Sequence, residues 1–83
     1  MNLKFQRILL VDDDTVYLQR LARALRDRGC TVAAVESAEA AVAAAEELQP
    51  DAAVLDLRLP GASGLECLRQ LRTVRPDLRV LML

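Results

Sequence analysis

Residues 7–14 read Arg-Ile-Leu-Leu-Val-Asp-Asp-Asp, an apolar run that ends abruptly at three aspartates. Such a run is expected of a strand that is buried on both faces of a sheet. Asp14 can serve as the N-cap of a following helix, and Gly29 can close its C-terminus. The residues between them follow the i, i+3, i+4, i+7 spacing of one apolar stripe, formed by Leu18, Leu21, Ala22 and Leu25. The sequence therefore predicts a strand over residues 7–11 and a helix over residues 15–28.

A second strand and helix follow in the same order. Residues 31–35 (Thr-Val-Ala-Ala-Val) predict a strand, after which Ser37 can cap a helix that ends at Pro50. The apolar face of that helix is formed by Ala38, Ala41, Val42, Ala45 and Leu48. Residues 52–57 form another short apolar run, but this run contains the carboxylate of Asp56, which is costly to bury inside a sheet. We therefore expect a third strand with Asp56 at its carboxyl end.

The last part of the chain adds a loop, a helix and a strand. Residues 59–64 (Leu-Pro-Gly-Ala-Ser-Gly) are loop-forming, and Ser63 with Glu66 makes a capping box. The helix that follows ends before Pro76 and carries Leu65, Leu68 and Leu71. Residues 79–83 (Arg-Val-Leu-Met-Leu) predict a fourth buried strand. Alternating strands and helices imply an α/β fold in which helices cover both faces of one parallel sheet, and we expect one domain over residues 1–83.

Composition excludes several classes of function. The 83 residues are 53% hydrophobic, enough for one globular domain, and the net charge of -1 offers no basic face for direct nucleic-acid binding. The chain has no His, and Cys30 and Cys67 lie far apart, which excludes the common zinc patterns and favours two reduced, mostly buried thiols. No apolar run approaches the roughly 18 residues of a membrane span, and the N-terminus lacks a signal-peptide core. We therefore expect a cytoplasmic protein that does not enter a membrane.

The carboxylates at the strand ends predict a metal site. If strands 7–11 and 52–57 are neighbours in a parallel sheet, then Asp12, Asp13 and Asp56 meet at one edge. Two carboxylates about 4 Å apart repel by about 1 kcal/mol in water and by about 4 kcal/mol at an effective dielectric near 20, and a cation would relieve this. Oxygen ligands without His or Cys favour Mg²⁺. Calcium is less favoured because the chain lacks the interleaved acidic pattern of an EF-hand loop.

Asp56 is the best-placed nucleophile. A carboxylate that faces a bound Mg²⁺ can attack phosphorus, because the metal bridges the phosphoryl oxygens and lowers the repulsion. Asp56 stands alone at a strand end, whereas Asp12 and Asp13 are adjacent and suited to act as ligands. The alternative is structural: Asp13 and Asp14 would cap the first helix, and Asp56 would open the following turn. We favour capping for Asp14 and the metal site for the other three.

Two motifs resemble those of a known family. The first is the run of residues 8–14, and the second is Asp-Leu-Arg-Leu-Pro at residues 56–60, followed by Gly64. Both are similar to the motifs that mark receiver domains of bacterial response regulators in two-component systems. The resemblance implies the flavodoxin-like (CheY-like) fold, with strand order 2-1-3-4-5, of which this chain would contain about four strands and three helices.

The resemblance also implies a role for each motif residue. Asp56 would accept a phosphoryl group from the phosphohistidine of a sensor histidine kinase. Asp12 and Asp13 would hold Mg²⁺ together with Asp56 and the backbone carbonyl of Arg58. The chain would be a regulatory phosphoprotein rather than an enzyme, although family members promote their own phosphotransfer and dephosphorylation. The run of residues 56–59 resembles receivers of DNA-binding regulators, which suggests a link to transcription regulation.

Other features of the family are only partly present. Pro60 and Gly64 would shape the loop after the phosphorylation site. Receivers also carry a Ser or Thr just after the fourth strand and a Lys after the fifth, and the sequence stops before either position. Lys4 precedes the first strand, so it cannot replace that lysine. We therefore expect a fragment whose fourth strand lies at the sheet edge, where it invites self-association.

Two other functions stay open. A receiver-like fragment that is not phosphorylated could serve as a self-association or folding unit, which the missing Ser/Thr and Lys would explain. A flavin-binding flavodoxin is disfavoured, because three aspartates occupy the place of its phosphate-binding loop and would repel the phosphate.

Overall fold

The computed structural model describes residues 6–56, 58 and 64–83, and strands and helices alternate along them as the sequence predicts. The elements are β1 (Arg7–Val11), α1 (Thr15–Asp27), β2 (Thr31–Val35), α2 (Ala38–Leu48), β3 (Ala52–Leu55), α3 (Gly64–Val74) and β4 (Arg79–Met82). Asp14 caps α1 by accepting a hydrogen bond from the Tyr17 N–H, and Ser37 caps α2 by accepting one from the Ala40 N–H. Both predicted N-caps are confirmed. Ser63 of the predicted capping box lies outside the described residues.

The four strands form one parallel sheet in the order β2-β1-β3-β4. Val11 of β1 pairs with Val35 of β2 and with Leu55 of β3, so these three strands end level at one edge of the sheet. β3 ends at Leu55, which leaves Asp56 just beyond the strand. This agrees with the cost of a carboxylate inside a sheet. The predicted α/β class, the parallel direction and the strand order are confirmed.

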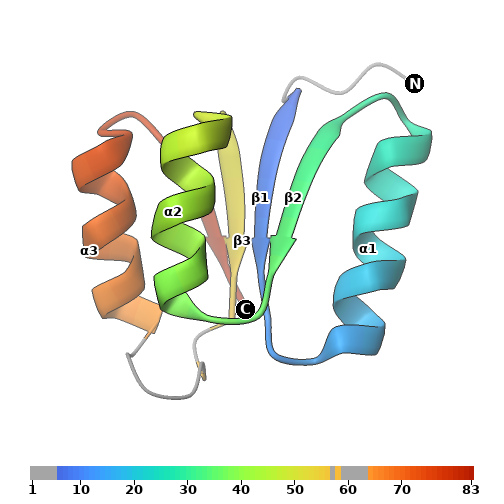
Figure 1. The fold of residues 1–83 in the computed structure, drawn as a ribbon, viewed down its shortest axis with the longest axis horizontal. Coiled ribbons are helices and arrows are strands. Elements are labelled where there is room, and N and C mark those ends of the chain that lie inside the picture. The colour runs from blue at the N-terminus through green and yellow to red at the C-terminus, as the bar shows by residue number, and fades with distance from the viewer. Residues whose placement is uncertain (1–5, 57, 59–63) are drawn as a thin grey trace.

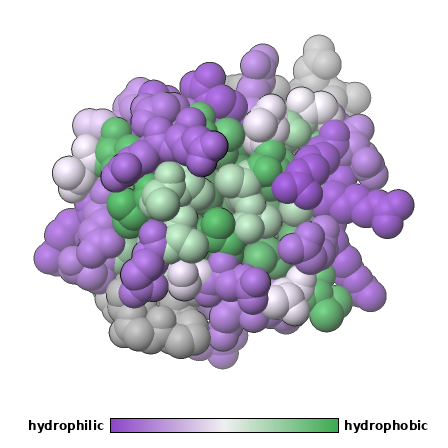
Figure 2. Space-filling model, viewed as in Figure 1, coloured by the Kyte–Doolittle hydropathy of each residue, from purple (hydrophilic) through white to green (hydrophobic). Residues whose placement is uncertain are grey.

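Helices cover both faces of the sheet, which makes three layers (Figure 1). α2 and α3 pack on one face, where Leu9 and Leu55 of the sheet meet Leu71 of α3 and three fully buried alanines of α2: Ala38, Ala41 and Ala45. α1 packs on the other face, where Leu18 and Ala22 meet the sheet. Viewed from the α2 side, the molecule shows a central apolar area surrounded by hydrophilic side chains (Figure 2). The buried core consists mostly of Ala, Val and Leu side chains.

One predicted core residue is wrong. Leu65 was assigned to the apolar face of the third helix, but it is 63% exposed. The buried residues of α3 are Gly64, Cys67 and Leu71. Leu65 lies about 100° around the helix from Gly64, which turns it away from the sheet. A leucine at a plausible spacing was therefore mistaken for part of the buried stripe.

The two cysteines agree with their prediction. Cys30 and Cys67 are both buried, and neither forms a disulfide with a described residue. Burial raises the pKa of the Cys67 thiol, and the negative charge of Glu39 raises it further. Cys67 therefore acts as a small apolar core side chain that keeps its proton at neutral pH.

The amino ends of the strands are held together by Asp51. Its carboxylate accepts hydrogen bonds from the N–H groups of Arg7 (2.9 Å) and Gln6 (3.2 Å). The guanidinium groups of Arg7 and Arg75 lie 3.4 and 4.0 Å away. The hydrogen bond from the Arg7 N–H lowers the pKa of Asp51; partial burial opposes this, and the charges of the two arginines add to it. Asp51 therefore ties β1 to the start of β3 and to the segment between α3 and β4.

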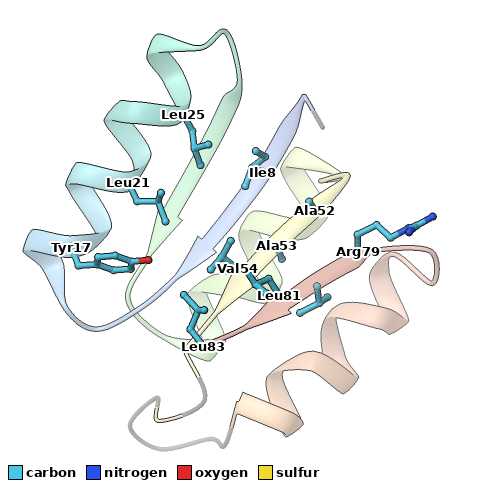
Figure 3. A pocket seen from close by; sticks show the side chains of 11 residues that line it. Ile8, Tyr17, Leu21, Leu25, Ala52, Ala53, Val54, Arg79, Leu81 and Leu83 are labelled. Carbon is cyan, nitrogen blue, oxygen red and sulfur yellow. The ribbon is translucent and has the colours of Figure 1, made fainter. Parts of the chain in front are cut away.

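The α1 face of the sheet is only partly covered. A hollow of about 510 Å³ lies between α1 and the sheet, and we call it the apolar groove (Figure 3). Tyr17, Leu21 and Leu25 of α1 form its wall, and strand residues that include Val54 and Leu81 form its floor. Leu21 and Leu25, which were predicted to lie in the core, are therefore only partly buried. Among the described residues, no helix is long and apolar enough to cross a membrane.

Candidate metal and phosphoacceptor site

The carboxyl edge of the sheet brings three predicted site residues together. Asp12 and Asp13 follow β1, and Asp56 follows the neighbouring strand β3. The sheet ladder continues one residue beyond the strands, because the Asp12 N–H donates to the carbonyl of Val35 (3.1 Å) and the Asp56 N–H donates to that of Val11 (3.0 Å). These hydrogen bonds therefore fix the backbone positions of Asp12 and Asp56, from which the two carboxylates extend. One oxygen of each carboxylate lies within 4.8 Å of an oxygen of the other two.

Two of these carboxylates are oriented by the backbone that follows them. Oδ1 of Asp12 accepts a hydrogen bond from the Asp14 N–H, and Oδ1 of Asp56 accepts one from the Arg58 N–H, both at 2.9 Å. Asp12 and Asp56 are half-buried, whereas Asp13 is exposed. Each oriented carboxylate uses one lone pair of Oδ1 for its turn, and its other lone pairs stay available to a metal ion or a reaction.

Asp14 is adjacent to the cluster but has another role. Its Oδ1 accepts a hydrogen bond from the Tyr17 N–H at 3.1 Å, and its carbonyl accepts the first helical hydrogen bond of α1, from the Leu18 N–H. These are the bonds of an N-cap. The prediction that Asp14 caps the helix is confirmed. Asp12 and Asp13 lie in the cluster with Asp56 instead.

The three carboxylates line a shallow hollow of about 280 Å³. Asp14, Arg58, Tyr17 and Leu83 complete its wall. Tyr17 and Leu83 were not predicted as site residues, and both also line the apolar groove, so the two hollows adjoin. The signal for Tyr17 was its place in the first turn of the helix that follows the aspartates, a turn that lies at the carboxyl edge of the sheet.

The spacing of the carboxylates fits a divalent ion. Two ligands of one Mg²⁺ at about 2.1 Å each can be at most about 4.2 Å apart. The oxygens here are up to 4.8 Å apart, so a small side-chain rotation or a bridging water would complete the coordination. A cation would also offset the mutual repulsion of the three carboxylates. The donor set is oxygen only, which suits a hard ion.

Three further residues were predicted at or near the site: Arg58, Pro60 and Gly64. Arg58 lines the hollow, and its N–H contacts Asp56; the role of its carbonyl as a metal ligand stays a prediction. Gly64 is the first residue of α3 and is buried. Pro60 lies outside the described residues.

Comparison with known proteins places this geometry in a family. The model of the response regulator receiver domain matches residues 8–83. The acid tolerance regulatory protein ActR of Rhizobium meliloti (strain 1021) is 45% identical over 76 residues, which are 92% of this chain and 39% of that protein. The chain thus spans about two fifths of the length of this curated relative.

Solved structures agree. A CheY-like receiver domain protein from Methanospirillum hungatei JF-1 superposes with a TM-score of 0.87 at 32% identity, covering 95% of this chain and 63% of that one. A response regulator from Burkholderia pseudomallei superposes with a TM-score of 0.86 at 31% identity, covering 93% of this chain and 45% of that one. That structure is described as containing a phosphorylated aspartic acid, a calcium ion and citrate. The fold, the acidic edge and these relatives together show that the chain belongs to the receiver domains of two-component response regulators.

Proposed function

We propose that Asp56 is the phosphoacceptor of this receiver and that the donor is the phosphohistidine of a sensor histidine kinase. The supporting observation is the convergence of Asp12, Asp13 and Asp56 within 4.8 Å at the carboxyl edge of the sheet. The related Burkholderia pseudomallei regulator, which contains a phosphorylated aspartic acid, adds support by analogy. Residues 1–83 would form the N-terminal portion of this receiver domain, which would act in the cytoplasm and serve as a regulatory domain rather than a separate enzyme.

The metal would be Mg²⁺, held by Asp12, Asp13, Asp56 and the backbone carbonyl of Arg58. Bound there, it would supply positive charge that reduces the repulsion between the phosphoryl group and the attacking carboxylate. Because Ca²⁺ also binds oxygen ligands, and a related structure contains it, direct competition between the two ions is part of the test.

The chain's own residues prepare the nucleophile. The Arg58 N–H donates to Oδ1 of Asp56 and so orients the attacking carboxylate. The new P–O bond forms as the P–N bond of the phosphohistidine breaks, and the imidazole of the kinase leaves with the electron pair. The backbone at Asp56 is fixed by the sheet ladder, so the attacking oxygen needs little reorganisation. Pro60 and Gly64 would shape the loop that follows the acceptor.

A direct phosphorylation assay tests the proposal. Incubation with Mg²⁺ and acetyl phosphate should add the mass of one phosphoryl group to the protein, and peptide mapping should place it on Asp56. Asp56→Asn should abolish the gain, whereas Glu47→Gln, which removes a carboxylate from the exposed surface of α2, should leave it unchanged. A gain of equal size in Asp56→Asn would refute the assignment.

A second candidate function is an association unit. Its basis is β4, which pairs with β3 alone among the described residues and carries Leu81 with 58% of its surface exposed. Edge strands with exposed apolar side chains favour pairing with another chain. Under this alternative the protein would associate through β4 without being phosphorylated. The phosphorylation assay would then show no mass gain, although the protein self-associates.

A further inference from the structure

The strand β2 lies at one end of the sheet. The observed order is β2-β1-β3-β4, and β2 also comes first in the order 2-1-3-4-5 of the flavodoxin-like fold. Among the described residues, β2 pairs with β1 alone. Its sequence, Thr-Val-Ala-Ala-Val, contains neither a charged residue nor a proline, which are common means of keeping an edge strand from pairing with another chain. Protection of this edge by a charge therefore has to come from outside the strand.

The hydrogen bonds to β1 define which backbone groups of β2 face outward. The Thr31 N–H donates to the carbonyl of Gln6 (2.7 Å), and the Val35 carbonyl accepts from the backbone that follows β1 (3.1 Å). Successive strand residues direct their backbone groups alternately to the two sides of the strand. The N–H and C=O groups of Val32 and Ala34 therefore face away from β1, toward the outer edge of the sheet.

An arginine of the neighbouring helix occupies one of these outward groups. Arg26, in the last turn of α1, donates from Nη2 to the carbonyl of Val32 at 2.9 Å, and this contact is partly buried. Arg26 follows the fully buried Ala22 by one helical turn, so its side chain starts near the face of α1 that packs on the sheet, beside β2 (Figure 1). The guanidinium thus carries a positive charge to the outer edge of β2.

The outward groups of β2 fit those of a second copy of the same strand. In an antiparallel pair, Val32 would exchange two hydrogen bonds with the partner's Ala34, and Ala34 would do the same with the partner's Val32. A two-fold axis would then pass beside Ala33. The Ala33 side chain is small, and it lines a hollow of about 420 Å³ beside α2, together with Ala44, Glu47 and Leu48. An added strand would therefore find room on this face of the sheet.

The other face of the sheet also allows the pairing. α1 contacts both β1 and β2, where Leu18 and Ala22 meet Ile8 and Val32. If a helix lies above the boundary between these two strands, it and its symmetry copy are two strand spacings, about 10 Å, apart. This is an ordinary distance between the axes of packed helices. The α1 helices of the two copies would thus lie side by side without overlap.

Arg26 opposes this pairing in two ways. The Val32 carbonyl would have to accept a hydrogen bond from the partner's Ala34, but the guanidinium already occupies it. By symmetry each copy loses this bond, so two of the four hydrogen bonds of the pair are missing. The two guanidinium groups would also lie only two residues, roughly 7 Å, apart along the strands, and their like charges repel.

We propose that the outer edge of β2 is a surface for antiparallel pairing with the β2 strand of a second copy, and that Arg26 keeps this surface closed by binding the carbonyl of Val32. The side chain of Arg26 thereby limits self-association of the folded chain. The inference is independent of the role of Asp56, because it rests on the opposite end of the sheet order from β4 and on no residue of the acidic cluster.

A cysteine on the axis tests the role of Arg26. Opposed residues that are not hydrogen-bonded have Cα atoms about 4.5 Å apart, so Ala33→Cys places two thiols within disulfide range. Combined with Arg26→Ala, this reporter should form an intermolecular disulfide on mild oxidation at a rate at least about fivefold higher than when it is combined with Arg23→Ala. Two recovered backbone hydrogen bonds correspond to a factor of this size or larger.

The control variant is matched to the test variant. Arg23 is an exposed arginine of the same helix, so Arg23→Ala removes the same charge and leaves every other surface of the chain unchanged. The native thiols of Cys30 and Cys67 are buried, so their slow reaction with a small thiol reagent verifies that the disulfide forms between folded molecules. Equal rates of cross-linking in the two variants would overturn the role of Arg26.

A second cysteine position tests the register. Thr31 lies on the same face of β2 as Ala33, but the predicted pairing separates it from the partner's Thr31 by four residues, about 13 Å. In the Arg26→Ala background, Thr31→Cys should therefore form far less intermolecular disulfide than Ala33→Cys. If the two positions form the disulfide equally fast, the antiparallel pairing centred on Ala33 is wrong.

Sedimentation equilibrium measures the association without a reporter. Arg26→Ala should self-associate with a dissociation constant at least about fivefold lower than that of Arg23→Ala. Association that is equally weak in both variants would refute the proposal.

Discussion

Replacing Asp56 with Asn is expected to stabilise the metal-free protein. The carboxylate of Asp56 lies within 4.8 Å of those of Asp12 and Asp13, so folding brings three like charges together. Asparagine has nearly the same shape and keeps an Oδ1 that can accept the Arg58 N–H. The substitution therefore removes two repulsive pairs and retains the local hydrogen bond.

The magnitude follows from the spacing. A pair of charges 4.8 Å apart is worth about 0.9 kcal/mol at the dielectric of water and about 3.5 kcal/mol at an effective dielectric of 20. These side chains are half-buried or exposed, so the lower figure applies, and two pairs amount to about 1–2 kcal/mol. In a domain of this size, each kcal/mol shifts Tm by about 4–8 °C. We expect the Tm of Asp56→Asn in EDTA to rise by roughly 4–16 °C.

Thermal denaturation followed by circular dichroism measures this change. Mg²⁺ at about 100 times its Kd should stabilise the wild type by about 2.7 kcal/mol and the variant by much less, which closes or reverses the difference. High salt should reduce the difference seen in EDTA. Glu47→Gln makes the same change of charge on the exposed surface of α2 and should stay within about 0.5 kcal/mol of wild type. If Asp56→Asn has the Tm of Glu47→Gln in EDTA, the three carboxylates do not repel one another as the structure indicates.

Three further predictions concern the core, the helix N-caps and Asp51. Leu9→Ala should lower the free energy of unfolding, measured by urea denaturation, by about 2–5 kcal/mol, because Leu9 is fully buried. Leu65→Ala should lower it little, because Leu65 is 63% exposed. Similar losses in the two variants would contradict the assigned core. Asp14→Ala should cost about 0.5–2 kcal/mol, as should Ser37→Ala, because each removes an N-cap; an unchanged urea midpoint in either variant would argue against that cap. Asp51 has a folded pKa below its unfolded value of about 3.9, so its carboxylate contributes stability above that pH, and the contribution is lost as pH falls through the folded pKa. Asp51→Asn should therefore be less stable at neutral pH and lose less stability on acidification, and parallel urea-stability profiles between pH 7 and pH 2 would contradict this role.

Local patterns were sufficient to predict most of the fold. The strands over residues 7–11 and 31–35 have the predicted bounds because each is a short apolar run between polar residues. Gly29 closes α1 with a φ of +92°, as a glycine in this position can. The way in which α2 ends was harder to predict, because Gln49 takes a left-handed conformation at φ 51° that is uncommon for glutamine. Its side-chain amide donates to the carbonyl of Glu46, a contact that no pattern in the sequence indicates.

The candidate site was predictable because parallel strands bring their carboxyl ends to one edge. That rule alone predicts that Asp12, Asp13 and Asp56 lie together. Tyr17 was predictable from its place in the first turn of α1, but the contribution of Leu83 was not. It depends on how closely β4 approaches the site, which is a property of packing across the sheet rather than of any local motif.

The position of Asp51 has a consequence for how this domain can change. Asp51 fastens the amino ends of β1 and β3, and the acidic cluster lies at their carboxyl ends. Four or five residues of strand, roughly 13–17 Å, separate the two sets of charges. Effects of substitutions so far apart are usually additive. The acidic edge can therefore gain or lose ligands, and so adjust its affinity for ions and phosphate, while the opposite edge continues to hold the strands in register.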